Sequence, residues 1–340
     1  MIAPAQESSP RSPMRVAVIC HRHHIGGHQG HIYDALARRF PLTRVVVEET
    51  GWPQRLADLP GGGEFDAIVW RVKLKLLRDQ PPFDWQSYRG LRVMLDHDLY
   101  RNYPGLWPRS VNYHGAWPPV IQRQGFDLVL VSGKRVCELL RDEGVPAIWM
   151  PKAYEAGWLF DKGTQRRGLA YYGSLYSARE AMLDHLDRSP IAVHRFTCPE
   201  SALNDKLNHY LGVVICNMGM LRGGSGRTTP ASEAMLKNFE VAAAGTAPIC
   251  DPAPDLADLG FVDGLTAVVY TTFEDLVDRL HGYLEQPELL RAIGRRAAAL
   301  VSERHSWDHR VAFLERLLTQ PDPASSEVSW DLSSAPALSK

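Results

Sequence analysis

Residues 237–251 read KNFEVAAAGTAPICD, the pattern of a helix followed by a short buried strand. Lys237 and Glu240 are three positions apart and therefore share one face of that helix. Gly245 can end the helix in a left-handed conformation, because glycine has no β-carbon. A cation and a carboxylate so placed can hold a phosphate and a sugar hydroxyl together. Nucleotide sites at the edge of a parallel sheet are often built this way.

Composition indicates a globular protein of two domains. The 340 residues are 45% hydrophobic and 23% charged, and the net charge of −1 gives no reason to expect a nucleic-acid partner. The five cysteines are scattered without a CxxC pair, which favours reduced thiols and a cytoplasmic location. No apolar run approaches the roughly 18 residues of a membrane span. We therefore expect no integral membrane segment.

Both ends of the chain are predicted to be flexible tails. Residues 1–13 are rich in Pro and Ser without an apolar stretch, so they do not resemble a signal peptide. Residues 321–340 are rich in Ser, Pro and Ala, a composition that does not favour a packed core.

Short apolar runs alternate with helical segments along the first half. Val16–Cys20 is continuously apolar, as expected of a strand covered on both faces. Further strands are predicted at 44–48, 66–70, 91–95 and 127–131, and helices at about 28–40, 118–124 and 134–143. This alternation predicts an α/β domain over residues 14–155.

The pattern restarts after Pro151. Strands are predicted at 169–172, 192–196, 212–216, 247–250 and 267–270, and helices at 178–187, around Glu240, and at 273–284 and 287–301. We predict a second domain over residues 156–305. The fold class is therefore α/β, with two Rossmann-like doubly wound domains that face a cleft, where ligands usually bind.

Several stretches of the second half resemble one known family. The run YYGSLY at 171–176, the run KNFE at 237–240 before Ala244–Gly245, and the run SWDHR at 306–310 carry the likeness. The chain from about 127 to 318 resembles a GT-B glycosyltransferase, of the CgeB-like or "glycosyl transferases group 1" type. The resemblance implies that residues 306–320 form a last helix that crosses back to the first domain.

The resemblance also implies an activity. Such enzymes move a sugar from a nucleotide-sugar to an acceptor, here a hydroxyl or an amine, and those of this type retain the anomeric configuration. The first domain is then the acceptor side and the second binds the donor. No metal and no cofactor besides the nucleotide-sugar co-substrate is expected, because protein cations and helix dipoles can stabilise the departing diphosphate.

Five residues are the implied donor contacts. Glu240 matches the carboxylate that accepts hydrogen bonds from the ribose, and Lys237 matches a basic residue near the pyrophosphate. Gly173, Ser174 and Arg179 lie in and after the strand–Gly–Ser–Leu opening. The alternative is that these charges are solvated or form ion pairs, Arg179 with acidic neighbours in its own helix.

One departure from related retaining enzymes concerns a second glutamate. These enzymes often carry two glutamates eight positions apart, but the position eight before Glu240 is Ser232, and Glu233 is one residue off. How the sugar ring is held, and with which stereochemistry, therefore stays open.

The glycine-rich run at 222–230 is either a phosphate-binding loop or a surface loop, and Thr229–Pro230 is predicted to begin the helix that carries Lys237.

The first domain offers a histidine-rich loop. Gly26, Gly27 and His28 are predicted to form a loop that follows the first strand and faces the cleft. A zinc site from His24, His28 and His31 is the alternative, but two glycines intervene and no carboxylate or thiolate lies at ligand spacing. We predict no metal site.

Asp96 and His97 are the catalytic candidates of the first domain. They follow the apolar run at 91–95, and the carboxyl ends of parallel strands face the ligand crevice. His114 is a weaker alternative. Any of them can instead be a structural hydrogen-bonding group.

Two other functions are compatible with this layout. A nucleotide-sugar epimerase would need a carboxylate pair in the cleft, which the sequence does not indicate. A non-catalytic nucleotide- or sugar-binding protein would bind the donor without turnover. A nicotinamide-dependent oxidoreductase is disfavoured, because residues 24–30 do not supply the GxGxxG spacing.

Overall fold

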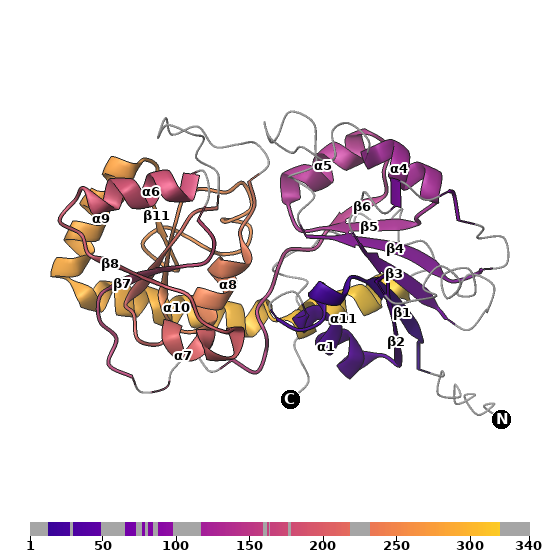
Figure 1. The fold of residues 1–340 in the computed structure, drawn as a ribbon, viewed down its shortest axis with the longest axis horizontal. Coiled ribbons are helices and arrows are strands. Elements are labelled where there is room, and N and C mark those ends of the chain that lie inside the picture. The colour runs from indigo at the N-terminus through magenta and orange to yellow at the C-terminus, as the bar shows by residue number, and fades with distance from the viewer. Residues whose placement is uncertain are drawn as a thin grey trace, which may run out of the picture.

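The protein forms two α/β domains that lie side by side (Figure 1). A computed structural model describes residues 13–27, 30–48, 65–72, 77–78, 81–83, 88–97, 117–158, 162, 164–175, 178–217 and 232–319. The predicted α/β class is confirmed. Among these residues, none of the helices has the length and apolarity that crossing a bilayer requires.

The first domain is built on a six-stranded parallel sheet of order β2-β1-β3-β4-β5-β6. Three of its inner strands, β1, β3 and β5, are buried along their whole length, which is why they appear as mainly apolar runs. The strands are β1 (Val16–Cys20), β2 (Leu42–Val46), β3 (Ala67–Arg71), β4 (Leu91–Asp96), β5 (Leu128–Val131) and β6 (Ala147–Trp149). The helical segments are η1 (Arg22–His24), α1 (His31–Arg39), α4 (Trp117–Gln124) and α5 (Lys134–Asp142).

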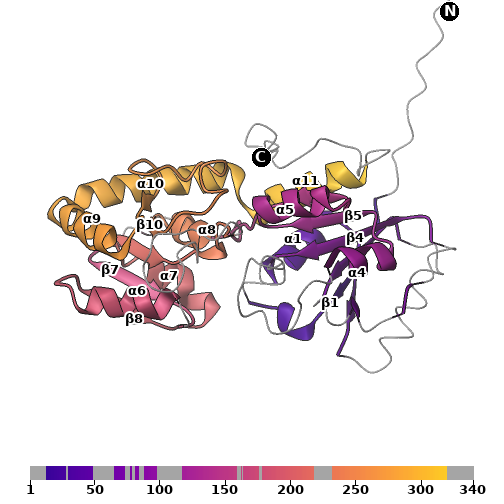
Figure 2. The ribbon, with the colours of Figure 1, turned by 90° about the horizontal axis from the view of Figure 1, so that it is seen from above.

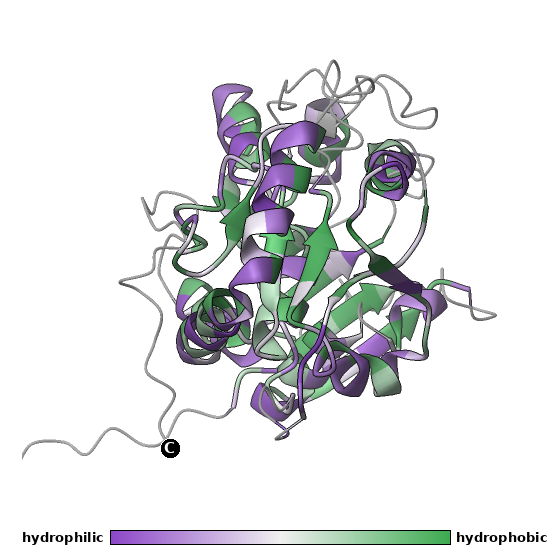
Figure 3. Cartoon of the chain, turned by 90° about the vertical axis from the view of Figure 1, so that its left-hand side faces the viewer, coloured by the Kyte–Doolittle hydropathy of each residue, from purple (hydrophilic) through white to green (hydrophobic). Residues whose placement is uncertain are grey.

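The second domain has a five-stranded parallel sheet of order β11-β10-β9-β7-β8. Its strands are β7 (Leu169–Tyr172), β8 (Val193–Phe196), β9 (Gly212–Ile215), β10 (Ala247–Cys250) and β11 (Val268–Val269). Its helical segments are α6 (Ala178–Asp187), η3 (Glu200–Ala202), α7 (Leu203–Leu207), α8 (Leu236–Ala243), α9 (Phe273–Glu285) and α10 (Pro287–Arg304). In Figure 3 the sheet is mostly green and the helices show purple faces, so the apolar surface gathers between the layers.

Most predicted elements are present, but η1, η3 and α7 were not predicted, and some bounds differ. β2 begins at Leu42, earlier than predicted, because its first residues are partly exposed at the sheet edge and lack an apolar run. β6 has only three residues and was not predicted as a strand, although all three are buried. A three-residue strand is too short to show a period.

The predicted start of the helix with Lys237 is wrong. Thr229–Pro230 lie outside the described residues, but α8 begins at Leu236 after Met235, and residues 232–235 are not helical. The backbone N–H of Ala234 donates to Asp255 Oδ1 at 2.8 Å, and that of Met235 donates to Asn217 Oδ1 at 3.3 Å. These side-chain acceptors hold the segment extended until the helix starts.

The chain crosses between the domains twice. The first crossing follows β6, and the second leads from α10 into α11 (Trp307–Leu318), which lies beside α1 of the first domain (Figures 1 and 2). The crossings pair with each other: Tyr154 N–H donates to the His305 carbonyl at 3.1 Å, and Trp307 N–H donates to the Tyr154 carbonyl at 3.0 Å.

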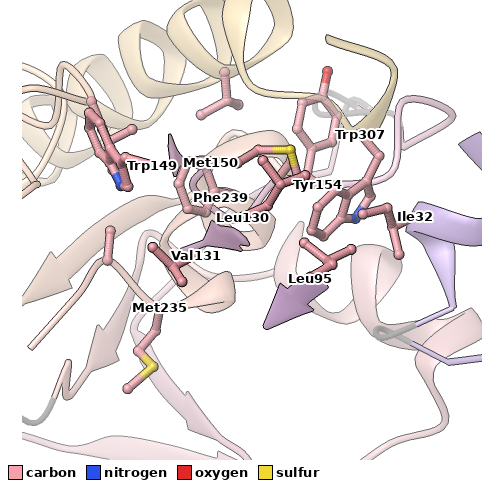
Figure 4. Close-up of a cluster of buried hydrophobic side chains, with 14 of the residues drawn as sticks. Ile32, Leu95, Leu130, Val131, Trp149, Met150, Tyr154, Met235, Phe239 and Trp307 are labelled. Carbon is pink, nitrogen blue, oxygen red and sulfur yellow. The ribbon is translucent and has the colours of Figure 1, made fainter. Parts of the chain in front are cut away.

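Apolar side chains join the two domains at these crossings. Figure 4 shows Met150 beside Phe239 of α8, with Trp149 and Trp307 on opposite sides of this pair and Met235, the residue before α8, farther below. All five are buried and belong to one continuous hydrophobic cluster. The relative position of the two sheets is therefore set by a packed core as well as by the connecting chain.

Candidate active site

Lys237 and Glu240 meet at the carboxyl end of β7. The Glu240 carboxylate is 3% exposed and accepts a hydrogen bond from the Tyr172 hydroxyl at 2.7 Å. The Lys237 amine donates to the Tyr172 carbonyl, and its Nζ lies 5.0 and 4.6 Å from the ring centroids of Tyr171 and Tyr172. One face of α8 thus places both charged groups against the last residue of a parallel strand, where ligands bind in this class of sheet.

Gly173 allows this close packing. Its φ is +98°, and a β-carbon at this position would lie 2.5 Å from Lys237 Nζ. Its conformation therefore favours glycine, and a β-carbon would force the Lys237 amine to move. The carbonyl of Ser174 then accepts hydrogen bonds from the Tyr171 hydroxyl at 3.0 Å and from Arg179 at 3.3 Å. The structure thus brings all five predicted donor residues into one cluster.

The charges of this cluster are held in a poorly solvated place. Burial, with a further contribution from the nearby Arg179 guanidinium, lowers the pKa of Lys237 to about 7, while Glu240 opposes the shift. Burial and the Glu240 carboxylate raise the pKa of Tyr172 well above its usual value, so its hydroxyl stays a donor. An anion bound beside Lys237 and Arg179, which lack full solvation here, would stabilise their charged forms.

Asn217 was not predicted to belong to the site. It follows β9, and its amide donates to the Asp251 carbonyl at 2.8 Å while its Oδ1 accepts from Asn238 at 2.6 Å. These bonds fix the beginning of α8 to the carboxyl ends of β9 and β10. The rule that selected Asp96 and His97, a polar residue directly after a buried strand, would also have selected Asn217.

Glu233 joins the two domains. It is 1% exposed and accepts hydrogen bonds from Lys152 Nζ and the Ser132 hydroxyl, both at 2.6 Å. Ser132 follows β5 of the first domain, and Lys152 lies in the first crossing. Burial and the Glu233 charge raise the pKa of nearby Asp255 to about 8. Glu233, one position away from where the second glutamate is expected, therefore forms a buried ion pair between the domains.

Asp96 and His97 lie at the carboxyl end of β4, next to the domain junction. The His97 ring stacks on Trp307 with centroids 5.3 Å apart, and its Nδ1 lies 3.4 Å from an Arg71 nitrogen. Burial, together with the Arg71 charge, lowers the pKa of His97 well below its usual value. The imidazole is neutral at pH 7 and packs against the last helix.

The loop after β1 faces the second domain. Gly26 and Gly27 have φ values of +84° and +70°, and a β-carbon on Gly27 would lie 3.0 Å from Glu200 Oε2. His28, His114 and the glycine-rich run at 222–230 lie outside the described residues. The described part of this loop thus reaches the carboxyl side of the second sheet.

A carboxylate does approach the histidine-rich loop. Within the described part of the chain, His21, His23 and Glu48 bring their ligand atoms within 4.8 Å of one another, and His21 Nδ1 lies 2.6 Å from Glu48 Oε1. Glu48 was missed because it follows β2, which pairs with β1 but is distant in sequence. His31 lies elsewhere, between Glu155 and Glu200.

Comparisons with known proteins agree with this geometry. Residues 216–316, which include α8, match the model of a family described as "Glycosyl transferase-like". Sucrose-phosphate synthase from Thermosynechococcus elongatus is 12% identical with a TM-score of 0.61, and the match covers 89% of this chain and 98% of that protein. HepE from Anabaena is 11% identical with a TM-score of 0.61, covering 89% and 99% of the two chains. AviGT4, a glycosyltransferase of avilamycin A biosynthesis, is 12% identical with a TM-score of 0.54, covering 92% and 99%.

No curated protein sequence matches the chain. At these identities the solved structures show the fold, which is GT-B, and the family match falls on the domain that carries the Lys237–Glu240 cluster. The protein thus has the GT-B fold, and its second domain is similar to a glycosyl transferase-like family.

Proposed function

We propose that this protein transfers a sugar from a nucleotide-sugar donor to an acceptor hydroxyl or amine. The observation that carries the proposal is the cluster of Lys237, Glu240 and Gly173 at the end of β7. HepE has been crystallised with UDP and with UDP-glucose, and a pneumococcal O-GlcNAc transferase with UDP and GlcNAc. These complexes make UDP the first nucleotide to test.

In this proposal each group of the cluster has one task. The Glu240 carboxylate accepts hydrogen bonds from the ribose hydroxyls, and Lys237 with Arg179 neutralises the diphosphate as it leaves. Because protein cations perform this neutralisation, no metal and no further cofactor is required. Retention of the anomeric configuration and a CgeB-like subtype are parts of the proposal that rest on the sequence resemblance. The interdomain role of Glu233 leaves the sugar ring to other groups.

We further propose a cytoplasmic location with no nucleic-acid partner. All five cysteines are free thiols, and four of them are buried. Reduced cysteines are typical of proteins in a reducing compartment.

A panel of nucleotides and nucleotide-sugars tests the donor class. Ligands that bind only the folded state stabilise it and so raise the melting temperature. A ligand at 100 times its Kd adds about 2.7 kcal/mol to the free energy of unfolding. We expect UDP or another nucleoside diphosphate, and its sugar conjugate, to raise the Tm by several degrees, and AMP or free phosphate to have little effect. If no nucleoside diphosphate or nucleotide-sugar shifts the Tm, the proposed function is wrong.

Nucleotide binding is also expected to take up a proton above pH 7. Burial lowers the pKa of Lys237 to about 7, so at pH 8 its amine is largely neutral in the free protein. A diphosphate beside it favours the ammonium form and raises that pKa. Calorimetry at pH 8 in buffers of different ionisation enthalpy should show an uptake approaching one proton in the wild type and much less in Lys237→Met. An equal uptake in both proteins would assign the proton to another group.

A further inference from the structure

A cavity lies between the domains, and none of its lining residues belongs to the Lys237–Glu240 cluster. Its volume is about 530 Å³. The first domain contributes Gly27 and His31, the first crossing contributes Trp158, and the second domain contributes Glu200, Asn204 and Asp205 from η3 and α7. None of these residues except Gly27 was a predicted site residue. We refer to this cavity as the Trp158 pocket.

The Trp158 pocket lies at the same sheet edge as the donor cluster, one strand further out. Glu200 follows the carboxyl end of β8, and β8 pairs with β7, which ends at Tyr172. The rings of Tyr172 and Phe196, the last residues of these two strands, stack with centroids 5.7 Å apart. On the other side of the pocket, Gly27 belongs to the loop at the carboxyl end of β1. The pocket is thus between the carboxyl edges of the two sheets.

The polar groups of the pocket suit a ligand with hydroxyls. Asn204 is 8% exposed, and its Nδ2 has no hydrogen-bond partner among the described residues. A buried amide donor without a partner costs about 1–3 kcal/mol, which a ligand oxygen can recover. The half-buried indole of Trp158 meets the His31 ring edge-on, at 6.5 Å between centroids. An aromatic face beside an amide and a carboxylate can hold a sugar ring by its apolar face and its hydroxyls together.

The charges of the pocket disfavour an anionic ligand. Glu200 and Asp205 line it, and Glu155 lies behind His31, whose Nδ1 is 3.4 Å from Glu155 Oε2. The His31 ring also pairs with Glu200 through Nε2. The one lysine of the lining, Lys162, forms an ion pair with Asp205. A phosphate placed here would be repelled by the carboxylates, because the one lysine among these lining residues already pairs with Asp205.

We infer that the Trp158 pocket binds the acceptor and that this acceptor is an unphosphorylated sugar. The inference rests on the proposed function, because it assigns the second substrate of the same transfer. The sugar ring lies against Trp158, and Asn204 and Glu200 bind its hydroxyls. The acceptor site is then shared by both domains, whereas the sequence placed it on the first domain alone.

Saturation-transfer NMR on the full chain with saturating UDP tests this inference. The probes are the methyl glycosides of glucose, galactose and mannose, with glucose 6-phosphate as the anionic comparison. The variants are Trp158→Ala and Asn204→Ala, and Lys206→Ala is the control, because Lys206 is exposed on the same helix α7 but does not line the pocket. We expect at least one glycoside to bind wild type and the control, and to bind both variants at least tenfold more weakly.

UDP affinity, measured on the same samples, separates this inference from the proposed function. It should be the same in all four proteins. The inference is overturned if no glycoside binds, if the glycosides bind both variants as they bind wild type, or if glucose 6-phosphate binds more tightly than the glycosides. If neither UDP nor any other nucleoside diphosphate or nucleotide-sugar binds to these proteins, the proposed function fails, whereas a selective loss of glycoside binding would still identify the pocket as a sugar site.

Discussion

Replacing Glu240 with alanine should weaken UDP binding by about 100-fold or more. In the proposed complex the carboxylate accepts hydrogen bonds from two ribose hydroxyls, and bonds to a charged acceptor are worth about 1.5–3 kcal/mol each. Every 1.4 kcal/mol corresponds to a tenfold change in Kd. Isothermal titration calorimetry with UDP measures the change directly. The expected result is a much larger Kd together with a protein that still folds.

The Tyr172 hydroxyl complicates this experiment, because Glu240 is its buried acceptor at 2.7 Å. Removing the carboxylate leaves the hydroxyl without that partner, which costs about 1–3 kcal/mol of stability. Tyr172→Phe is the matched control: it removes the same hydrogen bond and keeps the carboxylate. We expect less than a tenfold loss of UDP affinity for Tyr172→Phe, and an intermediate loss for Glu240→Gln, which keeps the size of the side chain without its charge.

The two single variants distinguish binding from structure. If Tyr172→Phe and Glu240→Ala lose the same affinity and the same stability, Glu240 is a structural acceptor and does not contact the nucleotide. If Glu240→Ala binds UDP like the wild type, the donor site lies elsewhere.

Replacing Arg310 with methionine should lower the free energy of unfolding by about 3–5 kcal/mol. The guanidinium is fully buried and donates to the carbonyls of Pro151, Lys152 and Arg304 at 2.7, 2.9 and 3.1 Å. It also lies 5.9 Å from the ring centroid of Phe239 on α8. The substitution leaves these buried acceptors without their donor, at the place where both crossings and α11 meet. Urea unfolding followed by fluorescence measures the loss.

Arg295→Met is the matched control, because Arg295 lies exposed on α10. It should change the unfolding free energy by less than about 0.5 kcal/mol. A similar small effect at Arg310 would mean that water replaces the guanidinium and that the junction does not depend on it. If Arg310→Met unfolds in two separate transitions, the substitution has uncoupled the domains while each still folds.

The elements that sequence reasoning located best are those whose signal is local. β7, β10 and α6 have the predicted bounds, because a buried parallel strand needs an apolar run and a helix needs its period. β6 and the start of α8 could not be located in this way. β6 is defined by its pairing with β5, and α8 starts late because Asn217 and Asp255 bind the segment before it.

The candidate site, too, was predictable only where its signal is local. Helical spacing alone places Lys237 and Glu240 on one face, and the left-handed conformation of Gly173 agrees with its residue type. No residue spacing indicates that Tyr172 forms hydrogen bonds with both Lys237 and Glu240. Nor does any spacing indicate that Glu233 pairs with Lys152 and Ser132 across the domains. Those partners are 68, 81 and 101 positions apart in the chain.

The sequence by itself thus determined the α/β class, most of its strands and helices, and the face of α8 that carries the charged pair. Each of these depends on residues within a few positions of one another. Only the tertiary structure decided which carboxylates are committed to ion pairs, which polar groups are buried, and that Asn204 and Trp158 share a cavity with Gly27. Burial and pairing are properties of the sheet order and the domain junction, and residues distant in sequence create both.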